Sequence, residues 1–439
     1  MSGDKFVLKS EEVAKPSRRS TYILITTMLV GLILFIVLFV LYDISLNLRT
    51  KYLLVTDCGL RTSKFSLFEY SDFYGRSNAW IRQRSYSTIS PGISSFVDNF
   101  TAGAEAILQE ANAVITGGVP PGCWKNTRIF LGAVAGVRML EKTNSEKAQA
   151  LVEAVRNTLA GSASEGVVVS KMKDVRVVSG ADQGFYAWLA INYLMGNFGG
   201  GGRQKTTFEK PALFEYSRPM AEAYLENSDS LHNPSSMLGA LNLGGASTQI
   251  TFVPETKGKM NKIAFGQEYN LYSHSHLCYG VATIRARYLA RLTQGFNLQN
   301  PVASPCHPSG LSMEVASDDI FQAPCVTSVG EDIMGPSIAK SSGAPPKIVF
   351  RGDYNSISCG QAIDEIFKEG SFATYRRPSL RGNFAGIHKL WEIVNSFITV
   401  DTSVEVTLTK FTAEIDKFCG ENWVVYIQSR HSISEHTTL

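Results

Sequence analysis

The sequence predicts an α/β protein made of two related domains that face each other across a cleft and are anchored by a membrane helix. Strand-like and helix-like segments alternate along the chain, which is the pattern of α/β folds. A strand, a glycine turn and a second strand occur together twice, at 53–68 and again at 237–253. A long uncharged run precedes the first copy. The chain has 439 residues, which is enough for two domains with cores of their own.

The second copy of the hairpin pattern contains two adjacent glycines. From Met237 to Val253, apolar residues alternate up to Leu243, a Gly-Gly-Ala-Ser turn follows, and alternation resumes. Glycines let backbone N–H groups approach a ligand closely, which suits a polyanion such as phosphate. The first copy, Leu53 to Phe68, repeats the order of strand, polar residue, glycine turn and strand. We interpret the two as equivalent hairpins of a duplicated domain pair, facing each other across a nucleotide cleft.

Composition excludes two other classes of protein. With 44% hydrophobic and 18% charged residues, the chain is globular rather than disordered. Its net charge of +3 is spread without long runs, so no nucleic-acid binding is indicated.

The uncharged run from Tyr22 to Tyr42 predicts a membrane anchor. At about 1.5 Å per residue, a helix of this length crosses the ~30 Å hydrocarbon layer. The alternative is a buried core helix, and the run is too long for an ordinary cleaved signal. We expect a cytoplasmic tail at 1–20 and the anchor at 21–43. The basic residues that favour a cytoplasmic N-terminus are Lys5, Lys9, Lys15, Arg18 and Arg19.

The rest of the chain is then expected in a lumen or outside the cell, where disulfides are plausible. There are seven cysteines, so at least one is unpaired. Asn99-Phe-Thr101 is the one glycosylation sequon. The polar segment 429–439 is expected to be unstructured.

Periodicity and breaker residues place the elements between the two hairpins. Helical periodicity after the first hairpin is stopped by paired glycines and prolines, and a second apolar helix face ends at Gly161. In chain order we expect a helix at 102–115, a buried strand at 127–131, a small-residue loop at 132–136, a helix at 145–159, a strand at 175–178, a turn at 179–184 and an apolar helix at 185–194.

The later part of the chain is more irregular. The glycine-rich loop at 199–202 is not a phosphate-binding P-loop, because no Gly-Lys-Ser/Thr follows and no strand leads into it. We expect it to be a flexible insertion. After the second hairpin we expect a helix at 281–292, a cross-linked loop region at 297–345, a strand at 347–350 and a helix at 385–397.

Five stretches together resemble the ecto-apyrases, the ectonucleoside triphosphate diphosphohydrolase family, and occur in that family's order. They are Val55–Tyr70, Ile129–Leu140, Val178–Phe198, Gly239–Phe252 and Tyr272–Gly280. The resemblance implies an actin-like fold of two RNase H-like domains, at 51–180 and 181–428, with the nucleotide between them. It implies hydrolysis of nucleoside tri- and diphosphates to monophosphates with Ca²⁺ or Mg²⁺, whose bound waters carboxylates hold. The motif around Cys278 is more similar to the membrane-bound surface branch than to the soluble Golgi branch, which favours the plasma membrane.

In the first half of the chain, the family's phosphate and metal positions are partly kept. Asp57 is expected to hold a metal-bound water, and Gly59 matches the phosphate-loop glycine. Leu60 and Arg61 stand where the family has two serines, so Arg61 either pairs with phosphate or points to solvent. The second loop has Val134 in place of a threonine, and Ala135 and Gly136 leave room for substrate; Arg138 is expected to be a structural ion-pair partner rather than a substrate contact.

Two carboxylates of the family pattern are replaced by amides. Gln183 stands where the catalytic glutamate belongs, and Asn242 where an aspartate would hold a metal-bound water. An amide is not a base at neutral pH, and general-base catalysis contributes about 10²–10⁴-fold. Asp182, next in the chain, is a possible substitute base, although neighbouring side chains at such a turn usually diverge. Ser247 and Gln249 match the family's water-positioning pair, and the second phosphate loop is matched by Gly244, Gly245 and Ala246.

The remaining histidines and cysteines are assigned structural roles. His274 and His276 lie two apart, but no Cys/His/Asp cluster with ligand spacing accompanies them. The resemblance implies disulfides Cys278–Cys325 and Cys306–Cys359, and leaves Cys123 and Cys419 without the family's partners. It also implies a C-terminally truncated or alternatively spliced form, because the family continues beyond the position of Leu439.

Three functions remain open from the sequence. The first is a membrane-anchored nucleotide-binding protein with weak or lost hydrolysis, which binds nucleotides or acts as an oligomeric partner or decoy for active paralogues. The second is an active hydrolase that uses Asp57, Asp182, Ser247 and Gln249 in an altered arrangement. The third is a structural protein that has lost its ligands.

Overall fold

The fold is known from a computed structural model of the whole chain. The residues described are 18–71, 81–161, 174–195, 197–198, 237–264, 267–327, 343–368, 372, 375–380, 382–397 and 407–428. Most of the expected cytoplasmic tail, the glycine-rich loop at 199–202 and the segment 429–439 lie outside them.

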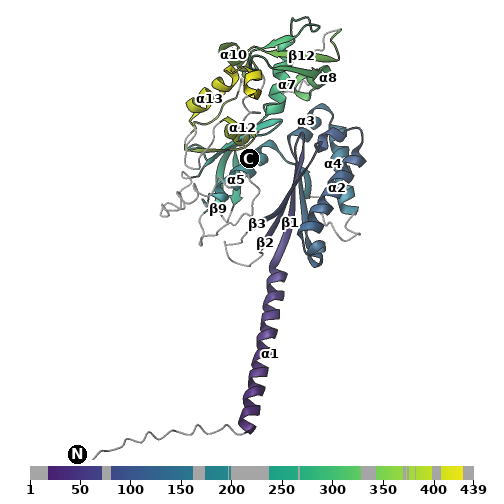
Figure 1. Cartoon of the computed structure of the whole chain (residues 1–439), viewed down its shortest axis with the longest axis vertical. Helices are drawn as coiled ribbons and strands as arrows, with labels where there is room; N and C mark the ends of the chain where they lie inside the picture. Colours follow the sequence, from purple (N-terminus) through teal and green to yellow (C-terminus); the bar gives the residue numbers. More distant parts are fainter. Residues whose placement is uncertain are drawn as a thin grey trace, which may run out of the picture.

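The first lobe is a five-stranded sheet with helices packed on it (Figure 1). Its strand order is β3-β2-β1-β4-β5, with β1 antiparallel to β2 and parallel to β4. Helices α2 and α4 pack on each other, α2 on β2 and β3, and α4 on β5. The strands are β1 Thr50–Cys58, β2 Ser63–Ser71, β3 Ile81–Ile89, β4 Arg128–Ala133 and β5 Val175–Val177. The helices are η1 Ile93–Phe96, α2 Phe100–Gly118, η2 Pro121–Asn126, α3 Ala135–Thr143 and α4 Ser145–Gly161.

The second lobe repeats this arrangement. Its sheet runs β13-β6-β7-β9-β8, with β6 antiparallel to β7 and parallel to β13. Thus β6 corresponds to β1, β7 to β2 and β13 to β4, and α5 (Gly180–Leu194) packs on β6, β7 and β9. The strands are β6 Gly239–Leu243, β7 Ser247–Phe252, β8 Met260–Ala264, β9 Gln267–Leu277 and β13 Phe384–His388. The repeated topology is that of the duplicated pair predicted from the two hairpins.

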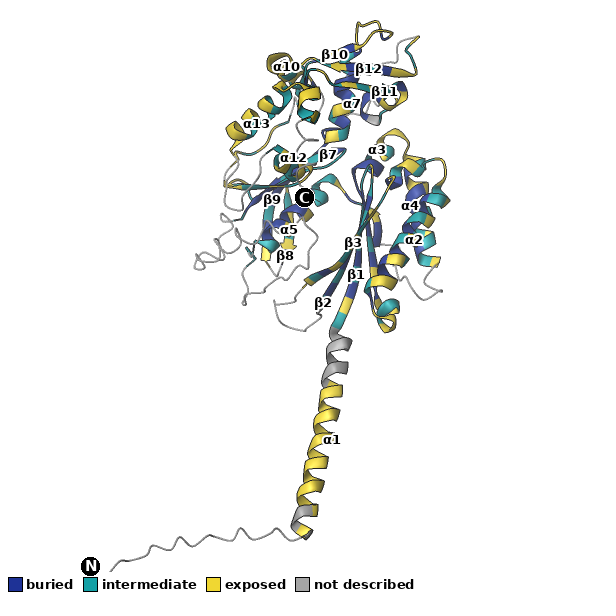
Figure 2. Ribbon diagram, viewed as in Figure 1, coloured by how far each residue is buried: buried dark blue, intermediate teal, exposed yellow. Residues whose placement is uncertain are grey.

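Alternating burial explains why these segments form sheets. In β1 every second side chain is buried, so one face of the strand joins the core under α2 and α4. Figure 2 shows the buried residues concentrated in the sheets and on the inner sides of the helices that cover them. The second sheet has its own core, in which Trp188 of α5 is fully buried against Tyr269 and Leu271.

A third, small sheet follows α7 (Val281–Leu292) in the second lobe, with strand order β10-β12-β11. The segment 297–345 was predicted as a cross-linked loop region, which was too simple, because short strands and helices form in it. Both disulfides implied by the family resemblance are confirmed, Cys278–Cys325 and Cys306–Cys359, and Cys58, Cys123 and Cys419 are free thiols. The remaining elements are β10 Val302–Ser304, β11 Ser312–Ala316, α8 Ser317–Phe321, α9 Pro324–Thr327, β12 Lys347–Gly352, α10 Ser356–Phe367, α12 Lys389–Phe397 and α13 Leu408–Gly420.

Three sequence expectations are wrong in ways that matter for the site. The predicted turn at 179–184 is helical from Gly180, where α5 begins, so Asp182 and Gln183 lie in its first turn. The predicted helix at 385–397 begins as strand β13, since 384–388 pair in parallel with β6, and only α12 is helical. The predicted loop at 132–136 is reduced to Val134, because β4 runs on to Ala133 and α3 starts at Ala135. In each lobe, therefore, the parallel strand passes almost directly into a helix beside the glycine turn.

Helix α1 (Arg18–Arg49) precedes β1 and stands away from both lobes (Figure 1). Its segment Tyr22–Leu41 has a mean hydropathy of 3.1 and none of it is buried in the protein. The alternative of a buried core helix is therefore wrong, and α1 fits a single membrane span.

His276 of β9 provides a test of the second lobe's packing. Its ring lies among His274, Phe372 and Tyr375, with ring centroids 4.4–4.5 Å apart. Burial and the charge of neighbouring His274 lower the pKa of His276 to about 4. Between about pH 6.5 and 4 the unfolded chain therefore binds a proton that the folded chain does not, and stability falls as pH falls.

We predict that His276→Phe removes this loss while keeping the ring contacts. Between pH 7 and pH 5, the midpoint temperature of unfolding should fall by about 3–6 °C more in the natural chain than in the variant. Differential scanning calorimetry checks this, and equal pH slopes for the two proteins would contradict it.

Candidate functional site

The two glycine turns have the same geometry. In the β1–β2 turn the Gly59 N–H donates to the Thr62 carbonyl at 2.9 Å, and in the β6–β7 turn the Gly244 N–H donates to the Ser247 carbonyl at 2.9 Å. A Cβ on either glycine would lie 3.1 Å from that carbonyl oxygen, which is tight for any other residue. Both lobes therefore present a closed turn at the end of the strand that carries the polar residue, Asp57 or Asn242.

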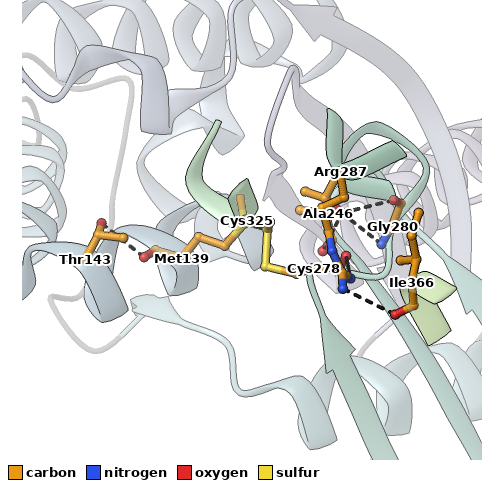
Figure 3. The surroundings of a disulfide bond; sticks show 9 residues. Met139, Thr143, Ala246, Cys278, Gly280, Arg287, Cys325 and Ile366 are labelled. Carbon is orange, nitrogen blue, oxygen red and sulfur yellow. Dashed lines mark hydrogen bonds between the residues drawn. A yellow bond between two sulfur atoms is a disulfide. The ribbon is translucent and has the colours of Figure 1, made fainter. Parts of the chain in front are cut away.

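The turns meet at an apolar contact between the lobes. Leu60 of the first turn packs on a buried cluster that includes Ala135, Ala246 and the Cys278–Cys325 disulfide. Figure 3 shows this disulfide between Met139 of α3 and the residues around Ala246. The Cys325 Sγ contacts the Met139 Sδ at 3.3 Å, and the Cys278 N–H donates to the Ala246 carbonyl at 2.8 Å. The disulfide thus fixes the second turn close to the first lobe.

Arg138 of α3 reaches across to the second lobe. Its Nη2 donates to the Gln183 Oε1 at 2.7 Å and to the Ser247 Oγ at 3.2 Å, and its Nη1 to the Ser275 Oγ at 3.3 Å. Gly180 permits this approach, because a Cβ there would lie 2.6 Å from Nη1. The expectation that Arg138 makes a structural ion pair is wrong for the described residues, since it bonds neutral oxygens there. It lies instead at the centre of the predicted catalytic residues.

A directed chain of hydrogen bonds continues from this point along the second hairpin. The Gln249 Nε2 donates to the Ser247 Oγ at 2.7 Å and to the Ser275 Oγ at 2.8 Å. The Asn242 Nδ2 donates to the Gln249 Oε1 at 2.8 Å, and the His388 Nδ1 donates to the Asn242 Oδ1 at 2.6 Å. Asn242, Ser247 and Gln249 are each 1% exposed, so the network is a buried and connected one.

Asp57 lies opposite this network, near His388. Its Oδ1 is buried and has no hydrogen-bond partner among the described residues. Burial raises the pKa of Asp57, against the opposing charges of His388 and Lys64. Burial also lowers the pKa of His388. Both shifts favour the neutral forms, so the pair loses charge rather than forming a strong ion pair.

Asp182 does not point into the network. The Lys262 Nζ lies 2.7 Å from its Oδ1, and the Ser179 Oγ donates to its Oδ2 at 2.8 Å. Partial burial alone would raise the pKa of Asp182, but the bonds from Lys262 and Ser179 lower it. Since the helix begins at Gly180, Asp182 and Gln183 leave its first turn in different directions. Asp182 is therefore poorly placed to act as a base within this network.

A cavity of about 300 Å³ lies between the lobes beside the first turn. Leu60 and Arg61 line it from the first lobe, and α7, β11 and α8 line it from the second. Arg61 therefore borders a space between the lobes. A larger hollow of about 580 Å³, between α3, α4 and β5, contains none of the predicted site residues.

The residues fit a divalent cation poorly. Within the described chain no three His, Cys, Asp or Glu side chains gather in a way that could hold a metal ion. The unpartnered Asp57 Oδ1 is a suitable hard ligand, but the Asn242 Oδ1 already accepts from His388. Mg²⁺ is commonly held by one or two carboxylates together with substrate phosphates, so Asp57 is the minimum that such a site needs, and Asn242 adds no negative charge to it.

Two facing RNase H-like lobes with matching glycine turns define a protein of the actin-like class. Comparisons agree with this: a family model described as the GDA1/CD39 (nucleoside phosphatase) family matches residues 44–437. The chain belongs to that family. The relatives to which it is similar include ectonucleoside triphosphate diphosphohydrolase 8 of Gallus gallus, 26% identical over 90% of this chain and 74% of the relative. Human ectonucleoside triphosphate diphosphohydrolase 2 is 27% identical over 85% of this chain and 69% of the relative.

A solved structure of nucleoside triphosphate hydrolases from Neospora caninum shares the fold. Its TM-score is 0.57 with 14% identity, and the match covers 85% of this chain and 79% of that chain. At this identity the likeness supports the fold alone.

Sequence reasoning missed His388 and Ser275 and misjudged Arg138. His388 was hidden because its segment was assigned to a helix, whereas the duplication places a strand parallel to β6 there, as β4 is parallel to β1. Ser275 faces Gln249 across the β7–β9 pair, which the alternation along 267–277 could have indicated.

The second turn is held by the start of α7, which yields a matched pair of variants. The Val281 and Ala282 N–H groups donate to the carbonyls of Gly244 and Gly245 at 3.0 and 2.9 Å. A Cβ on Gly280 would lie 2.4 Å from the Ala246 nitrogen, whereas a Cβ on Gly245 would meet no atom within 4 Å. We predict that Gly280→Ala lowers the free energy of unfolding by about 2 kcal/mol or more, and that Gly245→Ala changes it by about 0.5 kcal/mol or less. Urea unfolding measures both, and equal losses would contradict this geometry.

Proposed function

We propose that this chain is a membrane-anchored family member that binds nucleoside tri- and diphosphates and hydrolyses them weakly or not at all. The observation that carries the proposal is the buried network in which both family carboxylate positions are amides. Gln183 accepts from Arg138, and Asn242 is bonded on both sides, to Gln249 and His388. Neither amide can take a proton from a water at neutral pH.

Binding of the phosphates is supported by the paired turns. By resemblance, Gly59, Leu60 and Arg61 would form one phosphate loop and Gly244, Gly245 and Ala246 the other. Val134, Ala135 and Gly136 complete the first-lobe wall, since the Val134 N–H bonds the Cys58 carbonyl at 3.1 Å. The neighbouring 300 Å³ cavity is of the size that holds a small-molecule group.

We propose that the site binds a divalent cation more weakly than the family resemblance implies. Asp57 would hold waters of a Ca²⁺ or Mg²⁺ ion, and Asn242 would contribute no charge. We infer reduced divalent affinity from this loss, and the cation's chemistry, neutralising phosphate charge, would be correspondingly reduced.

The retained Ser247–Gln249 pair supports a second candidate, an active hydrolase. It would need another base, and Asp182 is held by Lys262. We therefore rank it below the binding protein, and below both we place a structural protein that has lost its ligands.

We place the folded region outside the cytoplasm, at the plasma membrane, with domains at 51–180 and 181–428. The basic residues before α1 and its exposed apolar surface support this orientation.

Restoring both carboxylates tests the loss of catalysis. We predict that Gln183→Glu with Asn242→Asp raises phosphate release from ATP and ADP in Ca²⁺ or Mg²⁺ by about 10²-fold or more. The gain requires the Gln249 side-chain amide to rotate by about 180°, because its Oε1 would otherwise face a carboxylate oxygen of the new aspartate at position 242. Gln183→Ala with Asn242→Ala serves as the control and should not gain activity. Natural-chain turnover equal to that of the restored variant would reject the proposal.

Asn99 tests the orientation. Its side chain is exposed, and its Oδ1 accepts from the Ala102 N–H to cap α2. Among the described residues the Nδ2 has no partner, so it is available for a glycan. We predict a mobility shift on glycosidase treatment of chain made in a secretory host, and no shift for Asn99→Gln. The orientation would be contradicted if the chain carried no glycan and if protease added to the cytoplasmic side of the membrane cleaved it near Asn99.

A further inference from the structure

We propose that Arg138 binds the phosphate tail of a nucleotide directly, so that this site takes its ligand without a divalent cation. The inference rests on the proposed function, since it assumes that phosphate lies between the turns. The new element is that the Arg138 guanidinium takes the place of the divalent cation as the positive charge that holds the phosphates.

Arg138 makes no ion pair within the described chain. The partners of its Nη atoms are an amide oxygen and two hydroxyls, and its Nε is buried without a partner. The nearest acidic influence is Glu141, one turn along the same helix. Burial lowers the pKa of Arg138 to about 10, so the side chain is still charged at neutral pH. A charge in this setting favours an anion as its partner.

The surrounding hydroxyls point to the same ligand. The Ser247 Oγ accepts from both Arg138 and Gln249, and so does the Ser275 Oγ. Each hydroxyl therefore has its own proton to donate, and no acceptor for either is present among the described residues. The donors in excess are the guanidinium and two O–H groups, which suits a phosphate because phosphate only accepts.

The excess of hydrogen-bond donors around Arg138 follows from having glutamine rather than glutamate at position 183. A glutamate at 183 would place a carboxylate against the Arg138 Nη2, at the position of an oxygen now 2.7 Å away. That ion pair would compensate the arginine and repel phosphate. With Gln183 the pairing is lost, and with Asn242 a second negative charge is lost on the far side of Gln249. The same two substitutions that weaken a cation site thus favour an anion site.

Arg138 lies at the contact between the two lobes, near both glycine turns. It is half-buried rather than sealed, and it lies beside Ser247 at the end of the second turn. The first turn is also near, since a Cβ on Gly136 of the same helix would lie 3.1 Å from the Leu60 Cα. A phosphate bound by Arg138 would therefore lie next to Ser247 at the end of the second turn.

Binding of ADP, pyrophosphate and adenosine to the full-length chain in detergent tests the proposal. Calorimetry is run in EDTA and again with Ca²⁺ or Mg²⁺. We expect ADP and pyrophosphate to bind the natural chain in EDTA and adenosine not to bind. Arg138→Gln and Gln183→Glu should each weaken binding in EDTA about tenfold or more, whereas Lys147→Gln, at a residue of α4 whose side chain is partly exposed and pairs with Asp98, should leave it unchanged. Arg61→Gln is measured alongside them.

The outcomes separate the two proposals. Binding by the natural chain only with a divalent cation would overturn direct binding by Arg138 and leave the proposed function standing. The absence of binding in either condition would reject both. If Arg61→Gln abolishes binding in EDTA while Gln183→Glu does not, the anion is held by the first turn, and the assignment to Arg138 is wrong. Gln183→Glu keeps the test decisive if Arg138→Gln does not fold.

Discussion

The hydrogen bonds from Arg138 to the second lobe are the interaction on which the site depends. One guanidinium from α3 joins α5, β7 and β9 through Gln183, Ser247 and Ser275. The two lobes therefore share one polar network rather than facing each other as separate surfaces. Because the bonds run to neutral groups, the network keeps its geometry while its electrostatics differ from those implied by the family pattern. This combination of retained shape and altered charge is the basis of every functional inference made for the chain.

The interlobe apolar contact supports that network. Leu60, Met139 and Ala246 pack around the Cys278–Cys325 disulfide. Figure 3 shows Met139 and Ala246 beside it. A rigid neighbour matters because hydrogen bonds between two lobes survive only if the lobes keep their relative position. Leu60 and Val134, where the resemblance implies hydroxyl-bearing residues, make this side of the site apolar. Apolar surroundings strengthen the interaction of Arg138 with any anion that reaches it.

Much of the fold could be predicted from the sequence because its signals are local. Alternation and glycine turns marked both hairpins, and helical periodicity marked α4 and α7 with nearly correct bounds. The assignment of Gln183 and Asn242 to the family's carboxylate positions, made from the motif order, stays a prediction. By contrast, β13 is a short strand whose pairing with β6 is distant in sequence, so apolar residues before α12 suggested a helix. His388 was missed for that reason. Arg138 was misjudged because its partners come from three elements of the other lobe, which no local pattern reveals.

The central claim is that the site holds a nucleotide but lacks the base that attacks it. A single-turnover experiment separates these steps most directly, with protein in excess over radiolabelled ATP in the presence of Ca²⁺ or Mg²⁺. The account predicts that protein-bound ATP is recovered intact after many minutes. Release of labelled phosphate within seconds, at a rate independent of further protein excess, would contradict it.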